Sequence, residues 1–241
     1  MLARPDLRRF LPAVGVSALG DGMSMVVIAW LAITISPPGQ QGWWTAFALA
    51  AFSMPATIGA FAFSRFVSRW RGARLVAADA TLRMVALAVI AALGLAHMLT
   101  PGWYVALLGI SSLLHAWGSA GTYTMIAELL PDEDHVPGNA LLSTISQTTF
   151  IVGPAMAGIL VPIIGPIWAL GADAVSYGVL AAVAWGLSRR VRGGVSLPSE
   201  GGNWRALFRY PQMLVLVLVT CLFFLLYGPV EVALPIFVAQ D

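Results

Sequence analysis

The chain has 241 residues, of which 59% are hydrophobic and only 10% are charged. A soluble protein of this length cannot cover its surface with so few charges, so the composition indicates a chain solvated mainly by lipid. All thirteen basic residues are Arg, and the net charge of +2 gives no reason to expect nucleic acid as a partner. The one cysteine, Cys221, excludes a disulfide within the chain and a cysteine-based metal site.

Seven apolar stretches are each long enough to cross the hydrocarbon core of a bilayer, which is roughly 30 Å thick and needs about 20 helical residues. We therefore predict an all-α membrane protein with seven transmembrane helices. In chain order, the expected spans are 10–35, 43–66, 75–98, 103–128, 139–161, 167–187 and 211–238. The breaks are predicted at Pro37-Pro38-Gly39, Arg71-Gly72, Pro101-Gly102, Pro137-Gly138 and Gly165-Pro166.

The distribution of arginines predicts the orientation of the spans. Twelve of the thirteen lie before span one, between spans two and three, or between spans six and seven. Positive residues favour the cytoplasmic side, so we expect a multi-pass protein of the plasma (inner) membrane with a cytoplasmic N-terminus and a cytoplasmic linker at 189–210. The acidic loop 131–137 falls on the same side, because acidic residues carry little weight in this rule.

Spans one to three share short sequence matches with spans four to six. The paired segments are Ala18–Gly20 with Ala116–Gly118, Pro55–Gly59 with Pro154–Gly158, and Ala78–Ala80 with Ala172–Ala174. The pairs keep the same order and nearly the same spacing. Three spans followed by three matching ones have opposite orientations in the bilayer, so we predict inverted repeats over about 10–98 and 103–188. Such repeats point to a secondary transporter.

Ionisable residues inside spans are costly and suggest function. Asp21 lies near the middle of span one and is expected to bind a proton or a cationic part of a substrate; the alternative is a polar contact that fixes packing. Asp79 and Arg83 lie one helical turn apart, which predicts a self-neutralising pair that docks span three, with a substrate role for Arg83 as the alternative. Asp173 is the repeat counterpart of Asp79, and both are expected at gate or packing positions.

Two further groups of residues complete the expected transport machinery. Glu231 follows Gly228-Pro229 in span seven, where a broken helix requires a cavity or protein beside it, so Glu231 is a candidate cavity residue. The small residues of span five and its proline predict a kink and close helix packing where spans repack during transport. These residues are Gly153, Pro154, Ala157 and Gly158.

The stretch Gly153–Gly158 is similar to the antiporter motif of the major facilitator superfamily. The run from Glu128 to Leu141 resembles the loop between spans four and five in its drug- and siderophore-exporting branch, which includes macrolide efflux proteins, and Gly20-Asp21-Gly22 fits span one. The resemblance implies efflux of drugs or other amphipathic small molecules by an alternating-access antiporter coupled to protons. It implies neither enzyme activity nor a cofactor.

The chain departs from the superfamily in the loop between spans two and three, where members carry an Asp-Arg pair. The corresponding residues here are Ser68 and Arg69, followed by Arg71 and Arg74. The Asp of that motif locks a gate electrostatically in members of the superfamily, so this lock is in doubt here, although the arginine cluster is present.

Members of the superfamily have twelve or more spans in two halves. Residues 1–188 resemble one six-helix half, 189–210 the linker, and 211–241 the first helix of a missing C-terminal half. The simplest expectation is a truncated transporter. The alternatives are a fragment without transport activity alone, and a half-unit that needs a homo-oligomer or the missing half as partner.

Other classes of membrane protein find less support. The absence of Lys excludes a retinal Schiff base. Ser111 and His115 lie four residues apart, but no companion motif of an intramembrane protease accompanies them. His97, His115 and His135 are scattered without a second ligand at helical spacing, so we expect no metal site.

Overall fold

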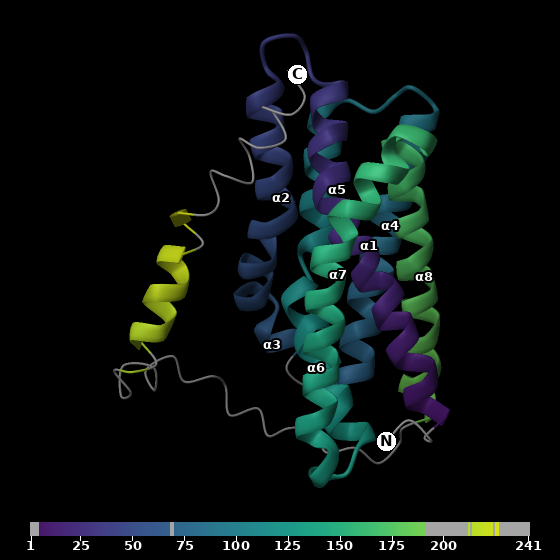
Figure 1. The fold of residues 1–241 in the computed structure, drawn as a ribbon, viewed down its shortest axis with the longest axis vertical. Helices are drawn as coiled ribbons and strands as arrows, with labels where there is room; N and C mark the ends of the chain where they lie inside the picture. The colour runs from purple at the N-terminus through teal and green to yellow at the C-terminus, as the bar shows by residue number, and fades with distance from the viewer. Residues whose placement is uncertain (1–4, 68–69, 191–211, 213, 224, 227–241) are drawn as a thin grey trace.

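A computed structural model describes residues 5–67, 70–190, 212, 214–223 and 225–226. Within these residues every regular element is a helix (Figure 1). The longer helices are α1 (Pro5–Ile35), α2 (Gln41–Ala62), α4 (Gly72–Leu95), α7 (His135–Ile164) and α8 (Pro166–Arg190). The shorter ones are α3 (Ser64–Val67), α5 (Pro101–Ser112), α6 (His115–Leu129) and the 3-10 turn η1 (Asp132–Asp134). A short apolar helix also covers Leu214–Phe223.

Five of the described helices, α1, α2, α4, α7 and α8, are long and apolar enough to cross a membrane. Lipid offers no hydrogen-bond partners, so each segment must satisfy its backbone groups internally, and an α-helix does this. The turns follow the chemistry expected from the sequence: Gly39 and Gly165 both adopt positive φ, near +81° and +82°. At the start of α5, Thr100 Oγ1 accepts a hydrogen bond from the Trp103 amide, and Pro101 occupies the first turn.

The fourth predicted span, 103–128, is not one continuous helix. It divides into α5 and α6 at Leu113 and Leu114, and neither half alone is long enough to cross a membrane. The break is covered by α2, because Ser112 Oγ donates to Ala51 O (2.9 Å) and Trp117 Nε1 donates to Gly59 O (3.1 Å). Side-chain donors of α5 and α6 thus bind carbonyls of α2 where the helix is interrupted.

Two other boundaries differ from the predictions. The break expected at Pro137-Gly138 lies inside α7, which begins at His135; proline is tolerated there because the first-turn amides have no partner within the helix. The second predicted span, 43–66, ends earlier as α2 and continues as the short helix α3. Most of span seven, 211–238, lies outside the described residues, so the predicted count of seven spans stays a prediction.

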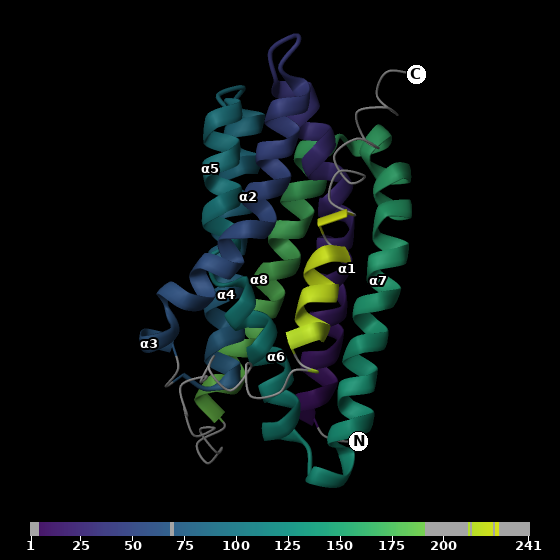
Figure 2. The same cartoon turned by 90° about the vertical axis from the view of Figure 1, so that its left-hand side faces the viewer.

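The helices pack in a pattern centred on α1, α4 and α8. The most extensive contact joins α4 to α8, and α1 packs on α7 and α8, whereas α5 and α6 pack on α2 and α4. The packing of α1 on α8 has a counterpart in the packing of α5 and α6 on α4. The packing of α1 on α7 likewise corresponds to that of α5 and α6 on α2. This correspondence is what the predicted repeat requires, but the repeat itself stays a prediction. Figure 2 shows α7 along one edge of the bundle and α5 along the other.

The two ends of the bundle are clearly separated in Figure 1. The start of α1 and the η1 turn lie at one end, and the turns after α1 and after α4 lie at the other. The core between them contains large buried side chains from several helices. They include Phe10, Ile28, Leu31, Leu87, Ile90, Tyr104, Leu108, Leu170 and Tyr177.

Candidate functional site

A single buried guanidinium, that of Arg83, lies at the centre of the candidate site. Arg83 is in α4 and is 2% exposed. Its Nη1 donates to Asp21 Oδ1 of α1 (2.8 Å) and to Tyr177 Oη of α8 (2.6 Å). Tyr177 Oη in turn donates to the same oxygen of Asp21 (2.5 Å). Three side chains from three helices therefore form a closed triangle of hydrogen bonds.

Asp79 is the second acidic partner of Arg83, after Asp21. Its Oδ1 lies 3.7 Å from Arg83 Nε on the same face of α4, an ion pair longer than a hydrogen bond. Both of these atoms are buried without a hydrogen-bond partner. The other oxygen of Asp79 lies 3.9 Å from His115 Nδ1 of α6. Asp79 is thus paired by charge with Arg83, and neither of these two contacts is within hydrogen-bond distance.

Aromatic rings enclose the guanidinium on its remaining sides. Arg83 Cζ lies 5.4 Å from the ring centre of Phe52 in α2 and 5.2 Å from that of Tyr177. A guanidinium over a ring face is attracted by the ring quadrupole, more strongly where water is excluded. Arg83 therefore connects α1, α2, α4 and α8.

Asp173 of α8 is a third buried acid, close to the triangle but outside it. It is 5% exposed. Ser24 Oγ of α1 donates to its Oδ2 (2.6 Å), and Ser176 Oγ donates to its Oδ1 (3.1 Å). Its partners are thus hydroxyl groups, whereas Asp21 and Asp79 both have a guanidinium.

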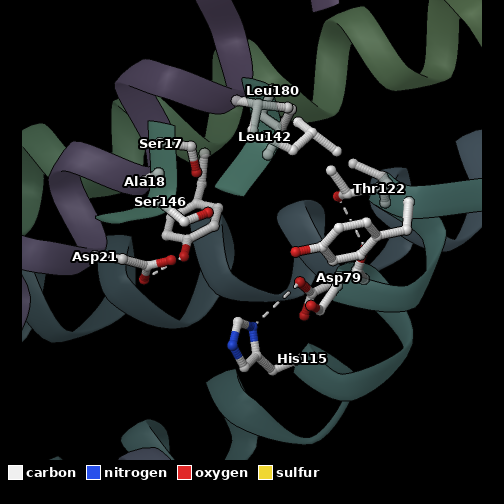
Figure 3. A pocket seen from close by; sticks show the side chains of 15 residues that line it. Ser17, Ala18, Asp21, Asp79, His115, Thr122, Leu142, Ser146 and Leu180 are labelled. Atoms are coloured by element: carbon white, nitrogen blue, oxygen red, sulfur yellow. Dashed lines mark hydrogen bonds and ion pairs between the residues drawn. The ribbon is translucent and has the colours of Figure 1, made fainter. Parts of the chain in front are cut away.

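A cavity of about 150 Å³ opens beside the triangle between α1, α4, α6, α7 and α8. Figure 3 shows Asp21 and Asp79 on its wall with His115 next to Asp79. The polar side chains of the lining are Ser17, Asp21, Asp79, His115, Ser119, Thr122, Tyr123, Ser146 and Tyr177. The volume equals that of about five liquid waters. This wall offers two carboxylates and several hydroxyls to a cation or to water.

The structure brings together the acidic and basic residues that the sequence singled out in spans one, three and six. Asp21, Asp79 and Arg83 form one network, and Asp173 is bound beside it by Ser24 of α1. The expected Asp79–Arg83 pair exists, but Arg83 lies closer to Asp21. The spacing alone suggested a pair that neutralises itself, but Arg83 also binds Asp21 and is shared between the two acids.

The small-residue set of span five divides into two parts. A methyl group added at Gly153 would meet the backbone of Gly22 at 2.5–2.6 Å, and Ala157 is fully buried, so these two residues form the close packing of α7 on α1. A methyl at Gly158 would meet no atom within 4 Å, so Gly158 is not part of this packing. Pro154 lies inside the continuous helix α7.

Three of the predicted site residues lie outside the described residues: Ser68, Arg69 and Glu231. Of the other arginines in that loop, Arg74 stacks its guanidinium 4.6 Å from the ring centre of Trp70. Arg71 precedes α4 as its N-cap residue. Within the described ranges, no group of three His, Cys, Asp or Glu side chains is arranged to hold a metal ion.

The sequence reasoning missed Tyr177, Ser24 and His115 as members of the network. The predicted repeat contained a signal for the first, because Tyr177 occupies the position in span six that Arg83 occupies in span three. Equivalent positions of an inverted repeat can meet only where both lie near its axis. Ser24 and His115 have no comparable signal, since serine and a lone histidine are common in such helices.

The fold and the site define a multi-pass helical membrane protein with a buried, charged centre. The family model described as Major Facilitator Superfamily matches residues 10–241, and the chain belongs to this superfamily. The superfamily consists of transporters, so the chain belongs to membrane transport in general. Comparisons with curated proteins and with solved structures give no match.

Proposed function

We propose that the chain takes part in export of amphipathic small molecules by alternating access, coupled to proton entry, as in the drug- and macrolide-exporting branch. The observation that carries the proposal is the cavity whose wall holds both Asp21 and Asp79 within membrane-crossing helices. Ionisable groups at such depth are costly and mark substrate or ion pathways. Asp21 is one-third exposed toward this space, so a solute can reach it.

The charge of the wall favours a cation. Two carboxylates, Asp21 and Asp79, share the single guanidinium of Arg83. The rings of Tyr123 and Tyr177 also line the cavity, and aromatic faces attract organic cations. An amphipathic molecule with a cationic group therefore matches the lining better than an anion does.

The triangle suggests how binding is coupled to movement. A proton or a cation on Asp21 competes with Arg83 for the same carboxylate, and so weakens the link between α1 and α4. The close contact of Gly22 with Gly153 then provides the surface on which α1 and α7 slide. Such a shift between two packed arrangements is the ordinary means of a conformational switch. In this proposal Asp79, Asp173, Pro154 and Ala157 act at the gate.

Transport of a fluorescent cationic dye tests the proposal. The chain is reconstituted in vesicles, and dye movement is followed with and without a proton gradient. We expect gradient-driven movement that is lost in Asp21→Asn. The matched control is Glu133→Gln, which removes an acid from the exposed η1 turn and should leave transport unchanged. Equal activity of Asp21→Asn and the unmodified chain would contradict the role of Asp21.

A second candidate function is that of a carrier unit that works only with a partner. The cavity, at about 150 Å³, is smaller than the roughly 300–1,000 Å³ of sites for drug-sized ligands. The helices α2 and α7 also leave most of their apolar surface uncovered, with 17% of the span window buried in each. A second copy or a further helical unit on these faces would enlarge the cavity. Dye transport that rises steeply with protein density in the vesicles supports this candidate.

A further inference from the structure

The buried acid Asp173 has a local environment unlike that of the other two acids in the network. Its Oδ2 accepts a short hydrogen bond from Ser24 (2.6 Å). Its Oδ1 lies 3.1 Å from Ser176 Oγ, whose one proton is shared with the main-chain carbonyl of Asp173 (2.8 Å). Ser24 is 2% exposed and Ser176 is 7% exposed, so water has little access to the carboxyl group. No ion pair of the described residues includes Asp173.

Among the described residues the network has three acids and one guanidinium, and Asp173 is the acid that forms no ion pair with that guanidinium. The guanidinium of Arg83 forms ion pairs with Asp21 and with Asp79. An ionised Asp173 would add a third negative charge with hydroxyl partners alone. Burying an unpaired carboxylate among apolar helices is costly, and such a group is neutralised by taking up a proton.

The surroundings leave no room for a metal cation in place of a proton. A methyl group at Gly20 would overlap Asp173 Oδ1, so the acid fills the space against α1. Asp173 is also absent from the lining of the cavity, whereas Asp79, its predicted repeat counterpart, belongs to it. A sodium or calcium ion needs several oxygen ligands at about 2.3–2.6 Å, and this packing offers no shell of that size.

We propose that Asp173 is a proton-binding site and carries a carboxylic acid proton in the state described. The proton comes from water and binds Oδ2, which converts the carboxylate to a neutral acid. The hydrogen bond with Ser24 survives because a serine hydroxyl both donates and accepts, so its direction reverses. The site is thus built to hold either protonation state without losing a partner.

Charged and titratable groups approach Asp173 from several helices. They are Asp21 from α1, Arg83 from α4, and Tyr177 from α8 itself. The helix α7 also packs on α8, but its titratable side chain, His135, is its first residue. Protonating Asp173 removes repulsion with Asp21, which leaves Asp21 free to hold Arg83. Loss of the proton would weaken the triangle.

This inference adds a second proton-binding acid beside Asp21, and it rests on the proposed function only for any part that this proton has in coupling. The test is infrared spectroscopy of the full chain in lipid nanodiscs, which distinguishes the C=O stretch of a protonated acid from the stretches of a carboxylate. The measurement needs neither substrate nor transport. A failed dye assay with a positive infrared result therefore rejects the proposed function alone, and the reverse result rejects the proton site alone.

At neutral pH we expect a protonated-acid band in the unmodified chain that is absent in Asp173→Asn and retained in Asp79→Asn. The variant Ser24→Ala should keep the band but shift its frequency, because the hydrogen bond to Oδ2 is lost. The matched control Ser17→Ala removes another buried hydroxyl of α1 and should leave the frequency unchanged. If Asp173→Asn does not fold, the frequency shift in Ser24→Ala still tests whether the band belongs to Asp173.

Three results would overturn the assignment. The first is the absence of a protonated-acid band at neutral pH. The second is a band that persists in Asp173→Asn and disappears in Asp79→Asn or Asp21→Asn. The third is a band whose frequency responds equally to Ser24→Ala and Ser17→Ala.

Discussion

Arg83 is the residue on which the packing of four helices depends, and its removal should be severe. We expect Arg83→Gln to lower the free energy of unfolding by about 3–5 kcal/mol, because Asp21 and Asp79 would lose their shared cation. Denaturation of the purified protein in mixed micelles measures this. The control Arg74→Gln removes an exposed guanidinium stacked on Trp70 and should cost no more than about 1 kcal/mol.

A second substitution tests whether the loss of stability in Arg83→Gln arises from the Asp21 carboxylate that is left without a cation. In the double variant Asp21→Asn with Arg83→Gln, the carboxylate of the short ion pair is absent. We expect the double variant to be more stable than the sum of the single losses predicts, because Arg83→Gln alone leaves the Asp21 carboxylate without its cation, and contacting residues are commonly coupled. Strict additivity would mean that the triangle contributes no coupling between α1 and α4.

Two glycines lie directly against the acids of α4 and α8. A methyl at Gly118 would overlap Asp79 Oδ2 and approach its Cβ to 2.6 Å, and a methyl at Gly20 would overlap Asp173 Oδ1. We expect Gly118→Ala and Gly20→Ala each to cost about 1–3 kcal/mol through overpacking. Gly118→Ala should be the more destabilising of the two. The new methyl would meet the Cβ of Asp79, which cannot rotate away, whereas at Gly20 it would first meet a carboxyl oxygen of Asp173.

The matched control is Gly158→Ala, where the added methyl meets open space. Helix propensity alone favours this change by up to about 1 kcal/mol. Thermal unfolding of the three variants compares them directly. A loss in Gly158→Ala as large as that in Gly118→Ala would contradict the packing described.

Prediction from sequence succeeded for residues whose partners lie on the same helix. The spacing of Asp79 and Arg83 is enough to place both on one face. The preference of Arg83 for Asp21 could not be predicted in the same way, because a contact between helices depends on how each is rotated and how deeply it sits. The predicted repeat pairs Asp173 with Asp79, but it gives no information on the serine partners of Asp173.

At the scale of elements, the interruption between α5 and α6 is held by donors that bind α2. Trp117 Nε1 donates to Gly59 O, and we expect Trp117→Phe to lower the free energy of unfolding by about 0.5–1.5 kcal/mol, since the ring is kept and the donor is lost. The control Trp103→Phe changes a ring that is 62% exposed and should have a smaller effect. Denaturation in micelles compares the two variants.

The long apolar helices were predictable because lipid imposes both their length and their backbone pairing. The end of α1 at Ile35 and the turn at Gly165 follow directly from the expected breaks. The break at Leu113-Leu114 was not predictable, because two leucines give no turn signal. Its cause is tertiary, since the carbonyls of Ala51 and Gly59 belong to another helix.

At the scale of the whole molecule, the two ends of the bundle can be assigned to sides of the membrane by labelling. In a Cys221→Ser background, we expect Glu133→Cys to react with an impermeant maleimide only from the cytoplasmic side, as the arginine distribution predicts. Gln40→Cys, in the exposed turn after α1, should react only from the opposite side. Reaction of both from one side would contradict a bundle whose ends are separated as in Figure 1.

The contact between Arg83 and Tyr177 has a consequence for the history of the chain. In an ancestor built from two identical three-span units, these equivalent positions would have carried the same residue type. Two guanidiniums in contact would repel each other, and two phenols would leave Asp21 without a cation. If the predicted repeat holds, an Arg can face a Tyr here only where its two halves differ in sequence. The charged centre would then depend on the divergence of the two halves at this one pair of positions.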